Sequence, residues 1–363
     1  MITAADRARA ADLMRQFVEA GALPVETAIL QPAGILLDLY GEDIRGRAFT
    51  TTDPLAGEAM LRPDFTVPVV QAHMESGAGV TRYAYAGEVF RRQEVDEGRP
   101  REYLQVGFEI FDGRAPAAAD AEVFDLISRA LAPWNARPAT GDLGILIAAI
   151  DGLTTSARRR AALRRHLWRP VRFRRLMKRY TNAIPPTHSR TVLLSQLERS
   201  TAEALIAAAG TAVGKRETAE IAARAASLVH DARTPPIART EAEVIEMILA
   251  MDGPMSAALS PLRDMAVDLP GLDAAVDRLE ARADALSARG HDPDRLPFAP
   301  ARGRSAMEYY DGFTFSFAAP ARPDLPPLAT GGRYDALTAA LGMGRSVPAV
   351  GGVIRPGLLG ELS

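Results

Sequence analysis

Two runs of alternating residues, separated by a short charged loop, constrain the fold of this chain more than any other feature. Residues 81–90 and 102–111 change side-chain character at every second position, and the loop between them is rich in arginine. A period of two is typical of β-strands, whose successive side chains point to opposite faces. The pattern predicts a strand, a charged loop and a second strand. Gln105 and Glu109 then share one face of the sheet.

This hairpin resembles motif 2 of the class II aminoacyl-tRNA synthetases, and its sequence is most similar to that motif in the histidyl enzyme. Four further segments resemble the same family in the family's order, so that about residues 1–150 and 300–360 are covered. They are residues 61–66 (Leu-Arg-Pro-Asp-Phe-Thr), 308–315 (Glu-Tyr-Tyr-Asp-Gly-Phe-Thr-Phe), 330–337 (Thr-Gly-Gly-Arg-Tyr-Asp-Ala-Leu) and 348–354 (Pro-Ala-Val-Gly-Gly-Val-Ile). The resemblance implies an α+β fold in which helices flank an antiparallel sheet.

The resemblance also implies a pocket for histidine. It carries the family's histidine contacts onto Asp64, Thr66, Gln105, Glu109, Tyr310 and Tyr334. Their oxygen atoms suit the ammonium and imidazole N–H groups of the amino acid, and Arg91 suits a carboxylate or a phosphate. Asp64 stands where the family usually has a glutamate, which shortens the side chain by one methylene. Gln93 also replaces a glutamate that is common in motif 2.

Plainer interpretations exist for several of these residues. Polar residues that alternate along a strand usually form its solvent face, so Gln105 and Glu109 taken alone carry little weight. Tyr309 is expected to point away from Tyr310 along a strand and to be an ordinary core aromatic. The glycine pair at 331–332 is weak evidence for a phosphate-binding turn. The common order of the segments favours the pocket.

Two arginines that contact the activated substrate in the synthetases fall on other residues here. Ser305 stands at the first position, with Arg304 beside it, and Leu358 stands at the second. Arg355 precedes a proline, and we expect it to face another direction and the proline to break the expected helix start. Loss of one such cationic donor typically costs about 2.7 to 4 kcal/mol of transition-state stabilisation. The sequence therefore predicts no adenylation and no catalytic residue.

A synthetase-like body without these arginines is similar to the regulatory subunits of ATP phosphoribosyltransferase. Membership would make the chain a noncatalytic subunit, required by a short-form catalytic subunit that is a glycosyltransferase. Histidine would be the effector, in feedback regulation at the first step of histidine biosynthesis. The chain stops at Ser363, and we expect no C-terminal anticodon-binding domain. By analogy with the fold, we expect a dimer across residues 25–40 within a hetero-oligomer.

Two other functions stay open on the sequence alone. The first is a truncated histidyl-tRNA synthetase or a free-standing enzyme that adenylates an amino acid. The second is an RNA-binding regulator related to the synthetases.

The middle of the chain changes character. We expect residues 1–150 and 300–363 to form the synthetase-like core, with 143–150 as a buried strand and an alanine-rich helix over 116–134. Residues 151–299 are expected to form a mainly helical insertion, with helices that begin near 201 and 241 at capping-box sequences. An apolar stripe through residues 272–286 is expected to lie on neighbouring helices. Strand patterning returns at 308–317.

Within the insertion, residues 158–179 contain eleven of the 43 basic residues of the chain and no acidic residue. Trp168, Phe173 and Tyr180 are interleaved with them. Phosphate contact combined with stacking on aromatic rings holds single-stranded nucleic acid, so an RNA-binding interpretation is open. A solvated or partner-facing pair of helices is favoured.

Composition excludes some classes of protein. A net charge of −2 does not indicate a nucleic-acid partner. The absence of cysteine excludes disulfides and thiolate metal sites, which fits a cytoplasmic protein. The five histidines lack ligand spacing, so we expect neither a metal nor another cofactor. The charged first helix does not suit a signal peptide, and the apolar run at 143–150 is too short to span a membrane.

Overall fold

A computed structural model describes residues 2–55, 57–93, 99–210, 214, 216–304 and 309–362. Its main sheet runs in the order β1-β5-β6-β12-β11-β10-β7-β9-β8, and all neighbours are antiparallel except β1–β5 and β7–β9. The strands are β1 (Leu23–Pro24), β5 (Thr81–Phe90), β6 (Glu102–Phe111), β7 (Arg137–Asp142), β8 (Gly253–Pro254), β9 (Pro297–Phe298), β10 (Phe313–Ala318), β11 (Ala329–Arg333) and β12 (Ala349–Ile354). The α+β fold with a mainly antiparallel sheet is confirmed.

The predicted hairpin forms the long centre of this sheet. β5 and β6 pair over ten residues each, with Tyr83 opposite Glu109 and Gly87 opposite Gln105. β12 pairs with the other edge of β6. The even-numbered residues of β6 from 104 to 110 are buried and apolar, and Phe108 packs against Phe17 of helix α1 (Ala4–Glu19). The odd-numbered residues face the opposite layer.

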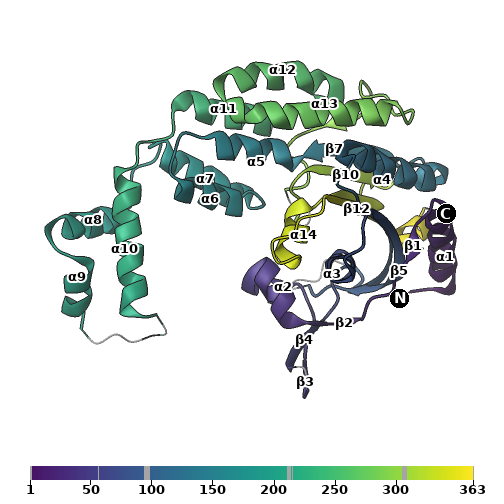
Figure 1. The fold of residues 1–363 in the computed structure, drawn as a ribbon, viewed down its shortest axis with the longest axis horizontal. Coiled ribbons are helices and arrows are strands. Elements are labelled where there is room, and N and C mark those ends of the chain that lie inside the picture. The colour runs from purple at the N-terminus through teal and green to yellow at the C-terminus, as the bar shows by residue number, and fades with distance from the viewer. Residues whose placement is uncertain are drawn as a thin grey trace.

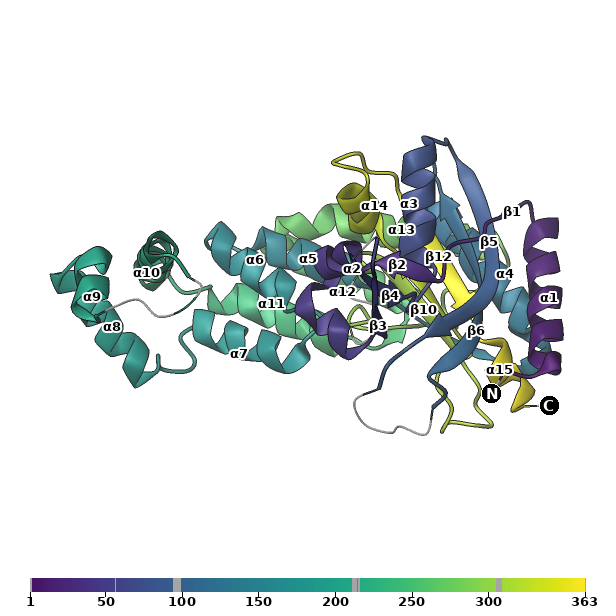
Figure 2. The ribbon, with the colours of Figure 1, turned by 90° about the horizontal axis from the view of Figure 1, so that it is seen from below.

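Helices cover both faces of the sheet (Figures 1 and 2). Helix α1 and helix α4 (Pro116–Leu131), with the turn η2 (Ala132–Trp134), lie on the apolar face, so the predicted helix over 116–134 is confirmed. A three-stranded sheet, ordered β2-β4-β3, stands beside the main one. This layer comprises β2 (Leu30–Pro32), α2 (Ala33–Tyr40), η1 (Gly41–Gly46), β3 (Thr50–Asp53), β4 (Gly57–Leu61) and α3 (Thr66–Ser76). The last helix segments are α14 (Asp335–Leu341) and α15 (Pro356–Gly360).

Residues 151–299 are mostly helical. Their helices are α6 (Ala157–Arg165), α7 (Pro170–Tyr180), α8 (His188–Arg199), α9 (Ala202–Ala208), α10 (Thr218–Arg233), α11 (Arg239–Ala250), α12 (Met255–Asp268), η3 (Pro270–Leu272) and α13 (Asp273–Ser287). The short strands β8 and β9 extend the main sheet from within this segment. Helices α8, α9 and α10 form a separate lobe that projects from the body (Figure 1). The stripe through 272–286 is buried, and α13 packs on α4 and α12, as predicted.

The structure corrects the prediction of a buried strand at 143–150. These residues form helix α5 (Leu143–Gly152), and the side chain of Asp142 caps it by accepting from the Gly144 N–H at 2.8 Å. Because α5 is buried around most of its circumference, its sequence is almost entirely apolar. It therefore shows neither the helical period of 3.6 residues nor the strand period of two. The cap was the available signal for a helix.

Other boundaries differ from the sequence expectations. Thr201 caps the helix expected near 201, but α11 begins at Arg239 after an Ala238 cap, so Thr240 lies inside the helix. The strand expected from 308 begins at Phe313. Tyr310 therefore lies in an irregular segment, and the alternation assumed for the two tyrosines is wrong. The glycine pair at 331–332 lies within β11 and forms no turn. Among the described residues, the structure contains no helix that is long and apolar enough to cross a membrane.

Candidate functional site

Glu109 lies at the centre of a buried polar cluster on the odd-numbered face of β6. Its Oε1 accepts a hydrogen bond from the Thr66 hydroxyl at 3.0 Å and one from the Tyr85 hydroxyl at 2.9 Å. Its Oε2 accepts from the Tyr334 hydroxyl at 2.5 Å. Glu109 itself is 1% exposed. The start of α3, strand β5 and the end of β11 therefore meet at one carboxyl group.

Glycines in the sheet make room for this cluster. A Cβ atom on Gly351, which pairs with Glu109 across β12 and β6, would lie 1.3 Å from Glu109 Oε2. A Cβ atom on Gly107 would lie 2.2 Å from the Tyr85 ring. Since any side chain at these two positions would collide with the cluster, the glycines are part of the site's shape.

Burial controls the charge of the carboxyl groups here. Burial raises the pKa of Glu109 to about 7, although the hydroxyls of Tyr334, Tyr85 and Thr66 oppose this by donating to the carboxylate. Burial also raises the pKa of Asp64, against the attraction of the Arg91 guanidinium. Asp64 adds a smaller upward effect on the pKa of Glu109. A cation placed between these two groups would favour their ionised forms.

Two acceptor atoms on this layer are buried without a hydrogen-bond partner in the described part of the chain. Asp64 uses Oδ1 to accept from the Val67 N–H at 3.4 Å, at the start of α3, and its Oδ2 has no partner. The Oε1 atom of Gln105, which lies four residues before Glu109 on the same strand face, has none either. Buried acceptors are costly unless a donor reaches them. These two oxygens therefore favour a ligand that carries N–H groups.

Aromatic rings line the cluster. Tyr310 and Tyr334 are both buried, and Tyr309 contacts each of them at ring-centroid distances of 5.0 and 6.0 Å. Burial raises the pKa of Tyr310 and that of Tyr334, and Glu109 adds to the effect on both, so both phenols are neutral at physiological pH. The Tyr334 hydroxyl donates its hydrogen bond to Glu109. The ring faces offer a flat apolar wall.

The structure corrects the prediction for Arg355. It precedes α15, which begins with Pro356, and a proline at the first helical position leaves the helix intact because the N–H it lacks has no intrahelical partner there. The Arg355 guanidinium donates to the Pro327 carbonyl at 2.5 Å and to the Thr330 hydroxyl at 3.3 Å. Burial lowers its pKa, with opposing influence from Tyr103 and Tyr310 and a further lowering by Arg91. Arg355 thus faces the same side as the cluster.

Arg91 lies at the edge of the site. Its Nε donates to the Pro63 carbonyl at 3.1 Å, and its guanidinium stands 5.8 Å from the centroid of the Tyr103 ring. The structure therefore brings Asp64, Thr66, Glu109, Tyr310 and Tyr334 together, places Arg91 beside Asp64, and puts Gln105 on the shared strand face.

The other cation positions considered from the sequence lie away from the cluster. Arg304 is buried, donates through Nε to the Leu167 carbonyl at 2.7 Å and lies over the Phe173 ring, on the insertion side. Leu358 is half-buried in α15 and packs against the core. Ser305 is outside the described residues.

Two members of the site are absent from the residues that the sequence predicts. Tyr85 lies in the predicted strand at 81–90 but is not among the predicted pocket residues. Its signal was the strand period itself, because a residue opposite Gly107 on an antiparallel partner must share its face. Arg355 was missed because its direction depends on the backbone after β12, which no sequence period describes.

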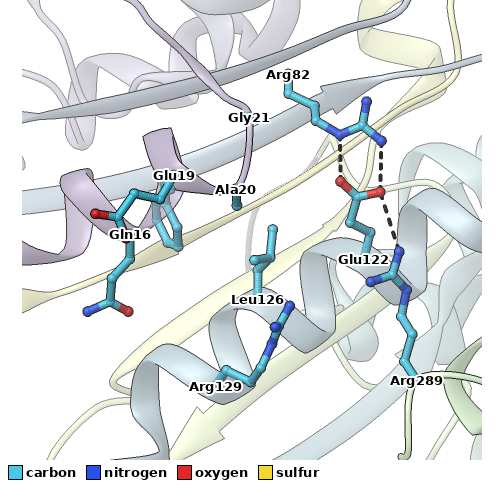
Figure 3. Close-up of a pocket in the computed structure, with 10 residues that line it drawn as sticks. Gln16, Glu19, Ala20, Gly21, Arg82, Glu122, Leu126, Arg129 and Arg289 are labelled. Atoms are coloured by element: carbon cyan, nitrogen blue, oxygen red, sulfur yellow. Dashed lines mark hydrogen bonds and ion pairs between the residues drawn. The ribbon is translucent and has the colours of Figure 1, made fainter.

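A hollow of about 730 Å³ lies on the opposite face of the sheet (Figure 3). Arg82 of β5 forms a two-pronged contact with Glu122 of α4 at 2.5 and 2.8 Å, and Arg289 reaches the same carboxylate at 3.5 Å. Arg129 pairs with Asp125 at 2.7 Å. The cations of this hollow are thus neutralised by neighbouring acids.

Comparisons with known proteins show which family the chain is similar to. The family model described as histidyl-tRNA synthetase matches residues 3–233 and 191–356. A protein named ATP phosphoribosyltransferase regulatory subunit from Allorhizobium ampelinum is 34% identical over 359 residues, covering 93% of each chain. One of the same name from Mesorhizobium japonicum is 32% identical over 360 residues, covering 94% of each.

Solved structures share the fold. One described as an ATP phosphoribosyltransferase regulatory subunit/histidyl-tRNA synthetase from Bacillus halodurans superimposes with a TM-score of 0.67 at 20% identity, covering 99% of this chain and 79% of the other. The histidyl-tRNA synthetase from Nostoc superimposes with a TM-score of 0.63 at 17% identity, covering 98% and 71%. The chain therefore belongs to the ATP phosphoribosyltransferase regulatory subunit family, whose fold is that of histidyl-tRNA synthetase.

Proposed function

We propose that this chain is the noncatalytic regulatory subunit of ATP phosphoribosyltransferase, required by a short-form catalytic subunit and sensitive to histidine. The observation that carries the proposal is the buried cluster around Glu109, in a chain whose relatives bear that name. Within the described residues, this cluster includes acceptors of Asp64 and Gln105 that have no donor. The catalytic partner would be a glycosyltransferase, and the subunit would act in the cytoplasm at the first step of histidine biosynthesis.

Histidine fits the chemistry of the cluster. Its ammonium and imidazole N–H groups would donate to Asp64, Gln105 and Glu109, and the tyrosine rings would flank the imidazole. A cationic ammonium would also draw Glu109 and Asp64 into their ionised forms, whose charge burial alone disfavours. Arg91 would pair with the ligand carboxylate.

We propose that the site around Glu109 does not support adenylation. Two arginines, Arg304 and Arg355, lie nearest in the sequence to the two lost positions, and each donates to oxygen atoms of the chain itself. Arg304 is fixed to the Leu167 carbonyl on the insertion side, and Arg355 is tied to Pro327 and Thr330. The second lost arginine position holds Leu358, which packs on the core. Preorganised cations at the transferred phosphoryl group are what such chemistry requires.

The experiment that tests this function is co-purification with a short-form catalytic subunit, followed by an activity assay with and without histidine. We expect the pair to be active, the catalytic subunit alone to be much less active, and histidine to inhibit the pair. Glu109→Ala is expected to lower histidine sensitivity while assembly persists. Histidine-dependent exchange of pyrophosphate into ATP by the chain alone would instead support an adenylating enzyme.

The oligomeric state and domain division are part of the proposal. Leu23, Ile29 and Leu30 are large apolar side chains that are 58%, 43% and 49% exposed, at or near the segment 25–40. We propose that a second copy of the chain covers them, giving a dimer within a hetero-oligomer. Residues 1–150 and 300–363 would form the core that dimerises, and 151–299 the insertion.

A further inference from the structure

A groove of about 660 Å³ between α6 and α10 gathers arginines that the pocket does not use. Arg158 and Arg165 come from α6, Arg224 from α10, and Arg216 from the residues just before α10. All four are exposed. The remaining lining residues are Glu220, Ile221, Ala223 and Ser227.

The charge of this groove is uncompensated. Within the described part of the chain, the four arginines have no ion-pair partner, and Glu220 is the single acid among the lining residues. The hollow in Figure 3 behaves differently, because its arginines contact Glu122 and Asp125. Arg159, next to Arg158 in the sequence, is buried and pairs with Asp231 at 2.7 Å. The groove therefore has a net positive charge that no neighbouring group of the described chain neutralises.

The lobe that forms one wall of the groove lacks a core of its own. Helices α8 and α9 contain no buried residue in the described structure, and the one buried residue of α10 is Asp231. Asp231 fastens the lobe by accepting from Arg159 and from Arg190, each at 2.7 Å. Three large apolar side chains of the lobe are left exposed: Val192, Leu193 and Ile221. Such a lobe gains little from its own packing and is suited to contact a partner.

The lining favours a protein partner over a nucleic acid. Ile221 offers apolar contact, and Glu220 would repel a phosphate backbone but can pair with a basic residue of a mixed surface. The aromatic residues interleaved with the arginines are not available for stacking, since Phe173 and Tyr180 are buried and Trp168 packs against the core. Stacking platforms are what single-stranded nucleic acid needs beyond charge.

We propose that the groove between α6 and α10 binds an acidic surface segment that also carries apolar residues, on the catalytic subunit. The proposal rests on the function proposed above and adds the surface through which the two chains meet. Charge of one sign in a groove accelerates association and selects the oppositely charged partner, and both effects weaken as salt screens the charges.

The test measures the affinity of the full chain for a short-form catalytic subunit, by surface plasmon resonance at 50 and 300 mM NaCl. The groove variant is Arg158→Glu/Arg165→Glu/Arg224→Glu, and the control is Arg172→Glu/Arg174→Glu/Arg175→Glu on the exposed side of α7. At low salt we expect the groove variant to bind about tenfold or more weakly and the control to change by less than about threefold. A triple variant with Gln at the same three groove positions removes the charge without reversing it, which guards against misfolding caused by charge reversal. The Glu220→Lys variant should bind the catalytic subunit more tightly.

Each outcome decides the proposal. If the wild-type chain binds and activates the catalytic subunit and the groove variants bind equally well, the groove proposal fails while the proposed function stands. If the wild-type chain neither binds nor activates it, both fail. Two further results would overturn the acidic-protein assignment. One is salt-sensitive binding of tRNA that the groove variant loses. The other is an unchanged affinity for the catalytic subunit with altered self-association in sedimentation.

Discussion

Two buried polar clusters on the same sheet differ in how completely their charges are paired. In one, Asp120 of α4 accepts from Arg282 of α13 at 2.8 Å and from Arg333 of β11 at 2.7 Å, and Arg282 also donates to Asp142 at 2.6 Å. All four residues are at most 6% exposed. In the other, Glu109 is surrounded by hydroxyls, and Asp64 and Gln105 each keep an acceptor that no described residue reaches with a donor.

The difference separates a structural cluster from the cluster that we propose binds a ligand. The Asp120 network joins the insertion to the core through opposite charges that satisfy one another, which is the condition for burying charge without a large penalty. The Glu109 cluster contains two buried carboxyl groups with raised pKa values, and its described donors are the hydroxyls of Thr66, Tyr85 and Tyr334 and the Val67 N–H. We propose that a ligand with N–H donors completes it.

The largest expected effect is on the Asp120 network. Asp120→Asn leaves Arg282 and Arg333 without their shared counter-charge, so we expect the free energy of unfolding to fall by about 3 to 5 kcal/mol. Urea denaturation at pH 7.5 measures it. Asp277→Asn, which breaks an exposed pair with Arg263, should cost less than about 1 kcal/mol. Equal losses in the two variants would remove the distinction between the clusters.

The next effect is the pH dependence of stability. The pKa of Glu109 in the folded chain, about 7, lies above the ordinary 4.5, so the folded state holds the proton more tightly. This stabilisation is complete below about pH 4.5 and is lost as pH rises through about 7, by up to about 3 kcal/mol. Glu109→Gln should lack the loss when both proteins are unfolded in urea at pH 5 and pH 8 without histidine. An equal loss of unfolding free energy between pH 5 and pH 8 in the two proteins would contradict this role of Glu109.

The same Glu109→Gln variant, which should be spared the loss of stability at high pH, should lose affinity for histidine. Because Glu109→Gln removes a charged acceptor for the ligand, we expect histidine affinity at pH 8 to fall about tenfold or more, with no loss of unfolding free energy. Equilibrium dialysis with labelled histidine measures the affinity, and Asp277→Asn serves as the control. A variant that is destabilised and still binds normally would make Glu109 structural.

The smallest effect concerns a single hydroxyl. Thr66→Ala removes one of the three donors to Glu109 and should lower the free energy of unfolding at pH 8 by about 1 kcal/mol. It should also raise the pH at which the stability that depends on Glu109 is half lost, since the carboxylate loses a hydrogen-bond donor. Thr66→Ser keeps the hydroxyl and is the matched control. No difference between the Ala and Ser variants would show that this hydrogen bond does not stabilise the carboxylate.

Much of the fold was accessible from the sequence because it has a local signature. The β5–β6 hairpin follows from its two-residue period, and the cap at Thr201 from its hydroxyl. Helix α5 was not accessible in this way, because burial on most sides removes the polar face that distinguishes a helix from a strand. The start of α11 after Ala238 uses no side-chain cap and leaves no residue to detect.

The site was predictable only where it lies on regular strands or matches family segments. Gln105 and Glu109 share a face by strand geometry, and the order of the segments placed Tyr310 and Tyr334 near them. Tyr85 follows from the register across β5 and β6, which requires the partner strand to be known. The direction of Arg355 depends on tertiary contacts to Pro327 and Thr330, which lie in a separate segment.

A calorimetric titration of the full chain with L-histidine, run beside the double variant Gln105→Leu/Glu109→Gln, decides whether the cluster around Glu109 is a histidine site. We predict saturable binding of one histidine per chain by the wild-type protein and none detectable in the double variant, with both proteins folded. Undiminished binding by the double variant, or none by the wild type, would contradict it.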